Sequence, residues 1–142
     1  MLLKQPLAIA TTHAAHLLPV TGLILRYRPQ VLLLTQTSVG PGAGQAELVQ
    51  SLLERVGLAE LVTALEIDEA ESYRRALAGD FSFHLQMSPQ IIDWLQKVRP
   101  AAVLGDAYEM SNYQHDVGRL MLDWAIKRYN SLGQVAENYE FP

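Results

Sequence analysis

The sequence contains no cysteine and few charged residues, and both shortages narrow the classes of protein to which it can belong. Without thiols the chain forms neither disulfide bonds nor a thiolate metal site, so a transition metal needs histidine and carboxylate ligands. Only 18% of the residues are charged, whereas 49% are hydrophobic, and this balance excludes a disordered chain. The composition favours a domain whose elements are buried on more than one face.

Positive charge is also scarce, because the formal net charge is −4 and the eleven Lys and Arg residues are scattered along the chain. This distribution argues against nucleic acid as a partner. No apolar stretch approaches the length of a membrane span. The apolar run at 6–10 is followed by polar Thr11, Thr12 and His13, which does not fit a signal peptide. We therefore expect a cytoplasmic protein that binds neither nucleic acid nor a membrane.

The chain alternates between apolar runs typical of strands and segments of helical periodicity. Strands are predicted over 6–12, 31–37, 61–67 and 101–107. Helices are predicted over 17–28 and over 88–98, the latter with Ser88 as N-cap and Pro89 at the first position. Two more are predicted in the segments that end at Gly57 and at Gly79. A last helix is predicted from the apolar face formed by Val117, Leu120, Met121, Trp124 and Arg128. Trp94 and Trp124 are expected in core or interface packing.

This order predicts one domain over residues 1–142, of the α/β class. We expect a Rossmann-like three-layer sandwich with a mostly parallel sheet of about four strands and right-handed crossovers. No further strand of normal strength is predicted after Tyr129. A sheet that ends this way can complete its edge with a second chain, so a homo-oligomer is expected.

Histidines cluster beside two strand ends that should be neighbours. His13 and His16 follow the first strand and His115 follows the fourth, and in a 3-2-1-4 order these strands lie side by side. Three neutral imidazoles can hold zinc and leave a position for water, so these residues are the candidate metal ligands. The alternatives are that His13 caps its turn, His16 is an exposed residue and His115 bonds a backbone carbonyl.

Three carboxylates near the fourth strand are candidate catalytic residues. Asp106, Glu109 and Asp116 could each orient an imidazole or accept a proton. The acidic segment 66–71 is instead predicted to be a solvated helix start without a chemical role.

Two further features have simpler interpretations. Glycine-rich Gly40–Gly44 precedes a helix and could hold a phosphate of a nucleotide or phosphosugar, but a flexible connection is favoured, because the P-loop ending is missing. His84, between Phe83 and Leu85, is interpreted as a packed or surface histidine.

Several stretches together resemble the PIG-L or LmbE-like deacetylases. They are the first strand with its turn at His13, and the segments LTQTSVGPG, AELVQSLLERVGL and VRPAAVLGDAYEMSNYQHDVGRLML. The resemblance implies a Rossmann-like fold, zinc at the strand ends, and removal of an acetyl group from an N-acetylglucosamine-type substrate. It also implies a domain shortened at its C-terminal end, since the family's later strands and substrate-binding segments would have to follow Pro142.

The family's H-P-D-D-E motif corresponds here to His13-Ala14-Ala15-His16-Leu17. The resemblance matches His13 and His115 to metal ligands and puts His16 where the family has an aspartate ligand. The family's general base falls on Ala15, which cannot accept a proton. Gln45 and Gln114 also replace a family Arg and Asp. The expectation is therefore an impaired zinc-dependent N-deacetylase, with a non-catalytic binding or assembly module of the same fold as the alternative.

Overall fold

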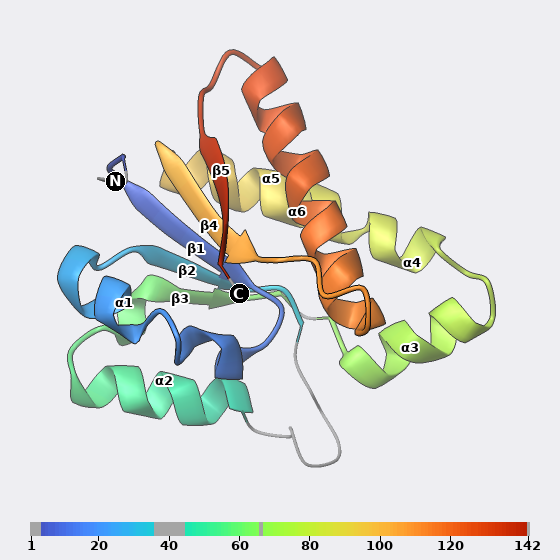
Figure 1. Ribbon diagram of the computed structural model, residues 1–142, viewed down its shortest axis with the longest axis horizontal. Coiled ribbons are helices and arrows are strands. Elements are labelled where there is room, and N and C mark those ends of the chain that lie inside the picture. Colours follow the sequence, from blue (N-terminus) through green and yellow to red (C-terminus); the bar gives the residue numbers. More distant parts are fainter. Residues whose placement is uncertain (1–3, 36–44, 66, 142) are drawn as a thin grey trace.

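The computed structural model describes residues 4–35, 45–65 and 67–141, and it has the predicted α/β architecture (Figure 1). Five strands form one parallel sheet in the order β3-β2-β1-β4-β5. The strands are β1 (Leu7–Thr11), β2 (Gln30–Leu33), β3 (Val62–Ala64), β4 (Ala102–Asp106) and β5 (Glu137–Phe141). The predicted order of the first four strands is thereby confirmed.

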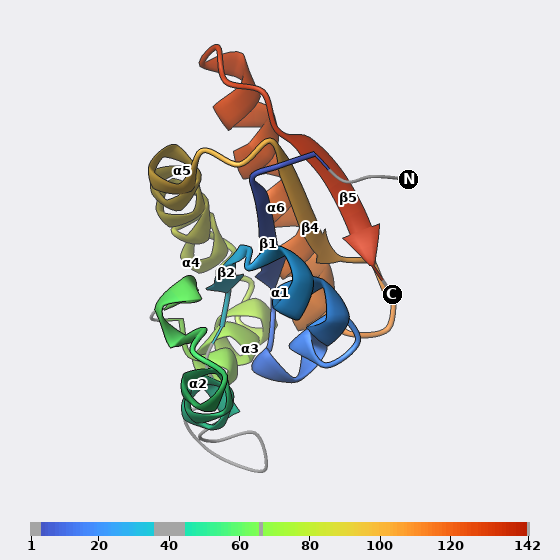
Figure 2. The ribbon, with the colours of Figure 1, turned by 90° about the vertical axis from the view of Figure 1, so that its left-hand side faces the viewer.

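Helices cover both faces of this sheet (Figure 2). One face packs against the 3-10 helix η1 (Ala14–Leu17), α1 (Thr21–Tyr27) and α2 (Gln45–Arg55). The other face packs against α5 (Met87–Val98) and α6 (Tyr113–Ser131). The short η2 (Ala59–Leu61) precedes β3, and α3 (Glu69–Leu77) and α4 (Ser82–Leu85) lie in the connection from β3 to β4. The result is the Rossmann-like sandwich of three layers.

The central strands are apolar throughout because both of their faces are covered. Along β1, Ala8 and Ala10 belong to the core under α5 and α6, whereas Leu7 and Ile9 belong to the core under α1 and α2. Every residue of β1 is buried. Burial of a large aliphatic side chain such as Ile9 contributes about 1.5–3 kcal/mol. None of the helices in the described residues has the length and apolarity needed to span a membrane.

The first predicted helix is wrong at its N-terminal end. Instead of one helix over 17–28, the structure has η1, a turn through Pro19, and α1 beginning at Thr21. Pro19 has no N–H to donate, and Leu18 and Val20 join it in the turn. The second strand also ends early, at Leu33, and residues 36–44, including Gly40–Gly44, lie outside the described residues.

One further detail of the predicted helices is wrong. Ser88 is not an N-cap, because α4 and Gln86 in the right-handed helical region lead directly into α5, and the Ser88 hydroxyl contacts the Met121 sulfur at 3.3 Å. Trp94 is buried in the core as predicted, whereas Trp124 is 53% exposed, so that the alternative role of interface packing stays a prediction for Trp124. The face of α6 that packs on the sheet instead contains Leu122, which is buried.

The fifth strand was not predicted, and its expected absence is wrong. β5 pairs in parallel with β4 from Glu137 to Phe141. The buried guanidinium of Arg119 on α6 connects to it, with Nη2 donating to Asn138 at 3.0 Å and Nη1 donating to the Tyr139 carbonyl at 3.2 Å. Contacts with a distant helix thus help to stabilise a segment whose own sequence is only weakly apolar.

Candidate metal centre

The order in which successive strands are added to the sheet changes direction between β1 and β4. From β1 the chain continues to β2 and β3 on one side, whereas β4 and β5 lie on the other. In open parallel sheets the carboxyl ends of the strands at such a point form the usual binding crevice. The segments that follow β1 and β4 contain all three histidines of the predicted cluster.

Two of these histidines lie in one tight turn after β1. His13 has an extended backbone immediately before η1, and the His16 N–H donates to the His13 carbonyl at 3.1 Å. This single turn brings the two ring centroids to 5.6 Å. A 3-10 turn eclipses residues three apart, which explains why both side chains face the same edge.

The third histidine comes from the first turn of α6. The side chain of Asn112 caps this helix by accepting from the Gln114 N–H at 3.1 Å. The His115 ring centroid lies 4.4 Å from that of His16 and 5.0 Å from that of His13. The structure therefore brings together the three residues that were predicted from the sequence as metal ligands.

A glycine lets α6 approach β1 closely enough for this contact. Gly118 lies one turn after His115, and a Cβ added to it would be 2.8 Å from the Thr12 hydroxyl oxygen. A larger residue would push the helix start away from the end of β1.

Asp106, at the end of β4, is a buried carboxylate that holds the His16 ring. Its oxygens accept from the Thr11 hydroxyl at 2.8 Å and from the Thr12 N–H at 2.6 Å, and Oδ1 lies 3.1 Å from His16 Nδ1. Burial alone would raise the pKa of Asp106, but the bonds from His16 and Thr12 outweigh it, and the pKa is below its ordinary value. The same hydrogen bond raises the pKa of His16.

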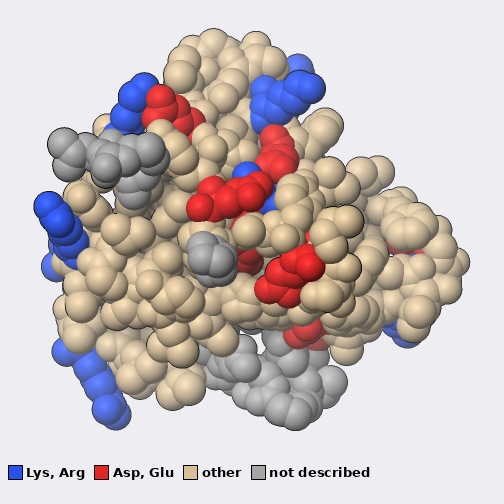
Figure 3. Space-filling model, viewed as in Figure 1, with Lys and Arg blue, Asp and Glu red and all other residues tan. Residues whose placement is uncertain are grey.

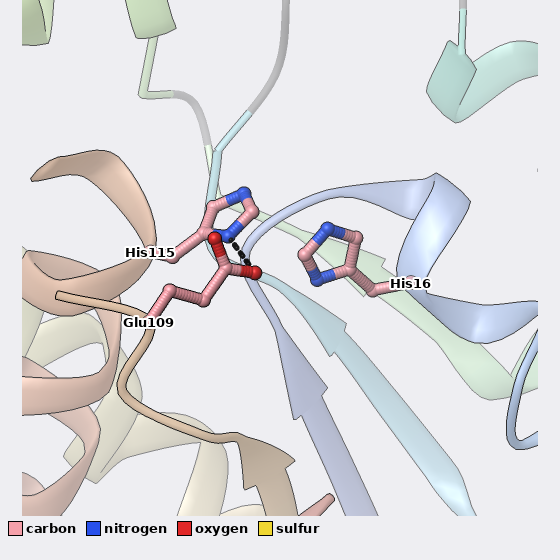
Figure 4. Close-up of side chains that lie close together, drawn as sticks. All are labelled: His16, Glu109 and His115. Atoms are coloured by element: carbon pink, nitrogen blue, oxygen red, sulfur yellow. Dashed lines mark ion pairs between the residues drawn. The ribbon is translucent and has the colours of Figure 1, made fainter. Parts of the chain in front are cut away.

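Glu109 faces the third imidazole. Its Oε1 lies 2.8 Å from His115 Nδ1 (Figure 4). The side-chain amide nitrogen of Asn112 lies 3.1 Å from Nε2 of the same ring. Nδ1 is buried, and among the described residues no group forms a well-aligned hydrogen bond with it, the Glu109 carboxylate included. A buried ring nitrogen of His115 thus lies next to the carboxylate of Glu109.

Glu69 joins the cluster, although no chemical role was predicted for it. Its Oε1 lies 3.6 Å from His13 Nε2. Burial lowers the pKa of His13, and the Glu69 charge opposes this only in part, so the imidazole is neutral at pH 7. The sequence signal that could have identified Glu69 was its position at the start of the helix that follows β3.

Asp116 and His84 have other roles in the structure. Asp116 Oδ1 accepts from the backbone N–H groups of Glu109 and Met110, at 2.8 and 3.2 Å, so it supports the loop that carries Glu109. His84 is packed away from the cluster, 3% exposed, with Nε2 2.7 Å from the Ser72 hydroxyl.

The donor set of the cluster fits a divalent transition metal. Ligand atoms of His16, Glu109 and His115 all lie within 4.8 Å of one another. Two ligands of one tetrahedral zinc ion are about 3.3 Å apart, so small side-chain rotations would bring these three into range. Asp106 already supports the His16 ring in the way that carboxylates support metal-bound imidazoles. These three residues could therefore hold a metal ion.

A pocket of about 440 Å³ opens beside the cluster. His16, Asp106 and Glu109 line one part, and Ala15, Tyr108 and Phe141 line another. Burial and a hydrogen bond to Asp123 raise the pKa of Tyr108 to about 12, so its hydroxyl stays protonated. A ligand of moderate size can therefore reach the candidate metal ligands.

Comparisons of the chain with models of protein families, with curated proteins and with solved structures found no significant match. The resemblance to the PIG-L or LmbE-like deacetylases therefore stays a prediction.

Proposed function

We propose that this chain is a divalent-metal-dependent hydrolase that cleaves an N-acyl bond, with the site at the ends of β1 and β4. The observation that carries the proposal is the convergence of three imidazole rings, whose centroids lie 4.4–5.6 Å apart, with the Glu109 carboxylate 2.8 Å from the buried Nδ1 of His115. Zinc is the metal favoured by this combination of nitrogen and oxygen ligands.

His16, Glu109 and His115 are the proposed ligands, and Asp106 is the residue that orients His16. When bound, zinc polarises a carbonyl oxygen and makes water more acidic. The sequence alone put His13 in the ligand set and Glu109 among the catalytic residues. We favour Glu109 as ligand because its oxygen is already 2.8 Å from His115 Nδ1.

His13 is then the proposed proton acceptor. It lies beside both ligand rings, and Glu69 at 3.6 Å can stabilise its protonated form. In the proposed reaction His13 takes a proton from water as the oxygen adds to the acyl carbon. It returns the proton to nitrogen as the C–N bond breaks, so that a carboxylic acid and an amine are formed. The resemblance suggests an N-acetylated sugar derivative as substrate.

Zinc titration of tag-free protein tests the metal site. We expect about one zinc ion per chain by elemental analysis and a raised unfolding temperature on adding zinc. His16→Ala and His115→Ala should each abolish both effects. His84→Gln is the matched control, because His84 is also buried but packs outside the cluster. No zinc above background, with an unchanged unfolding temperature, would overturn the proposal.

Acetate release from N-acetylglucosamine by the zinc-loaded chain tests the reaction. His13→Gln should lower the rate by about 10²–10⁴-fold and leave zinc binding intact, as expected for a proton acceptor. Loss of zinc binding in this variant would instead assign His13 to the ligand set.

A homo-oligomeric assembly module is the second candidate, favoured by an apolar groove between α1 and α2. The groove has a volume of about 260 Å³, and Leu18, Leu25, Leu52 and Val56 line it with exposures of 46–71%. Such exposed clusters often mark interfaces. Light scattering should then give twice the chain mass, and Leu52→Glu should give the mass of one chain. A single-chain mass for the unaltered protein would exclude this candidate.

A further inference from the structure

The pocket beside the candidate ligands combines negative charge with aromatic rings. The acidic residues Asp106 and Glu109 and the aromatic residues Tyr108 and Phe141 all line it. Tyr108 is 40% exposed and donates its hydroxyl to Asp123 on α6 at 2.9 Å, which holds the side chain in place. Carboxylates attract cations through their charge, and aromatic rings attract them through their electron-rich faces.

No Lys or Arg accompanies these carboxylates in the described segments that follow the strands, where the partner of Asp106 is His16. No Lys or Arg occurs in the described parts of these connections, residues 12–20, 34–35, 65, 67–68 and 107–112, and Glu109 lies in the last of them. On the face in Figure 3, acidic side chains gather near the centre and most basic side chains lie toward the rim.

Arg119 on α6 does not supply the missing charge. It is 3% exposed, its Nη2 lies 2.7 Å from Asp123 Oδ1, and it also bonds to β5. Among the described residues, a phosphate or carboxylate in the pocket would therefore find no available guanidinium, the usual partner of such anions.

We propose that this pocket binds an alkylammonium group, so that the substrate is an N-acyl compound that carries a separate, positively charged amine. The inference rests on the proposed hydrolase, and it specifies the substrate class of that same site. It excludes the phosphorylated and carboxylated N-acyl compounds that would need a basic residue at this edge of the sheet.

Binding of small probes tests the pocket without requiring catalysis. Titration of the full, metal-free chain with n-pentylammonium, 1-pentanol and pentanoate compares a positive, a neutral and a negative group on one carbon skeleton. We expect the ammonium probe to bind about tenfold more tightly than the alcohol and pentanoate to bind more weakly still. Equal or tighter binding of the alcohol or pentanoate would overturn the inference. If zinc fails to bind but this order holds, the hydrolase proposal fails and the cation site stands.

A matched pair of variants assigns the effect to the aromatic wall. Tyr108→Leu should lose about tenfold in affinity for n-pentylammonium and little for 1-pentanol, because only the cation gains from the ring. Tyr108→Phe keeps the ring, loses the hydrogen bond to Asp123, and should bind the cation within about twofold of the unaltered chain. Equal losses in both variants, or unchanged binding in Tyr108→Leu, would contradict the proposed role of the ring.

Turnover extends the test to the zinc-loaded protein. N-acetylputrescine, N-pentylacetamide and 5-acetamidopentanoate present the same acyl group with a cationic, neutral and anionic end. The value of kcat/KM should fall in that order, by about tenfold at each step. Faster hydrolysis of the anionic compound would contradict the substrate class. Zinc binding without hydrolysis of any of them would count against the hydrolase, while the probe titration still decides the pocket.

Discussion

Oδ1 of Asp106 lies 3.1 Å from Nδ1 of His16, and this contact joins the end of β4 to the turn after β1. The carboxylate is buried and also accepts from the Thr12 N–H. This pair thus connects the two segments that supply the candidate metal ligands. Because both side chains can gain or lose a proton, the contact is sensitive to pH.

The first prediction concerns this pH sensitivity in the metal-free protein. The pKa of Asp106 is lowered from 3.8, so its stabilisation is present above that value and is lost as pH falls through the lower, folded pKa. The pKa of His16 is raised from 6.5, so its stabilisation is present below that value and is lost as pH rises through the folded pKa. Asp106→Asn should therefore lower the free energy of unfolding by about 1–3 kcal/mol near pH 5.5 and by less near pH 8.5.

Urea unfolding of both proteins at the two pH values measures this difference. The lowered pKa values of His13 and His84 act in the opposite direction, but these residues are present in both proteins and their effects largely cancel. A larger effect of the substitution at the higher pH would contradict the assigned ion pair.

The second prediction concerns the approach of α6 to β1. Gly118→Ala puts a Cβ 2.8 Å from the Thr12 hydroxyl oxygen and should destabilise the fold by about 1–3 kcal/mol. It should also weaken zinc binding, because the displaced helix carries His115. Gly22→Ala in α1 is the control: nothing lies within 4 Å of its added Cβ, and the change should be neutral or stabilising by up to about 1 kcal/mol. Equal free energies of unfolding and equal zinc affinities in the Gly118→Ala and Gly22→Ala variants, measured by denaturant unfolding and zinc titration, would contradict the steric explanation.

The third prediction concerns Ala15, which lines the pocket and is exposed. Ala15→Asp would add a carboxylate where the deacetylase resemblance has its general base, and should raise kcat for acetate release by about 10²-fold. Ala15→Asn has the same shape without the proton acceptor and should not raise it. Similar rates in the two variants would show that the carboxylate does not act as a base.

The fourth prediction concerns the attachment of β5 to the sheet. Arg119→Met should cost about 3 kcal/mol, because Asp123 and Asn138 lose their buried partner. Amide hydrogens of 137–141 should then exchange faster, whereas those of β1 should change less. Arg128→Met, at an exposed position on the same helix, should leave both unchanged. Unaltered exchange in β5 of the Arg119 variant would mean that pairing with β4 suffices.

The layered α/β fold and the proximity of the three histidines follow from local patterns in the amino-acid sequence. Continuous apolar runs at β1, β2 and β4 indicate strands covered on both faces, and alternation with helices requires parallel crossovers. Once β1 and β4 are neighbours, His13, His16 and His115 must follow adjacent strand ends. These inferences depend on local patterns, which a single sequence contains.

Which side chains face each other depends instead on how the helices pack against the sheet. The contact of Glu69 with His13, the pairing of Glu109 with His115, and the place of β5 beside β4 join residues that are distant in sequence or separated by a loop. Their distances depend on how closely a helix packs on the sheet, as at Gly118 and Thr12, where an added Cβ would come within 2.8 Å of the hydroxyl oxygen. Hydrophobic periodicity identifies which face of a helix packs on the sheet but not how close the helix lies to it. That distance depends on the volumes of the side chains on the helix and on the sheet.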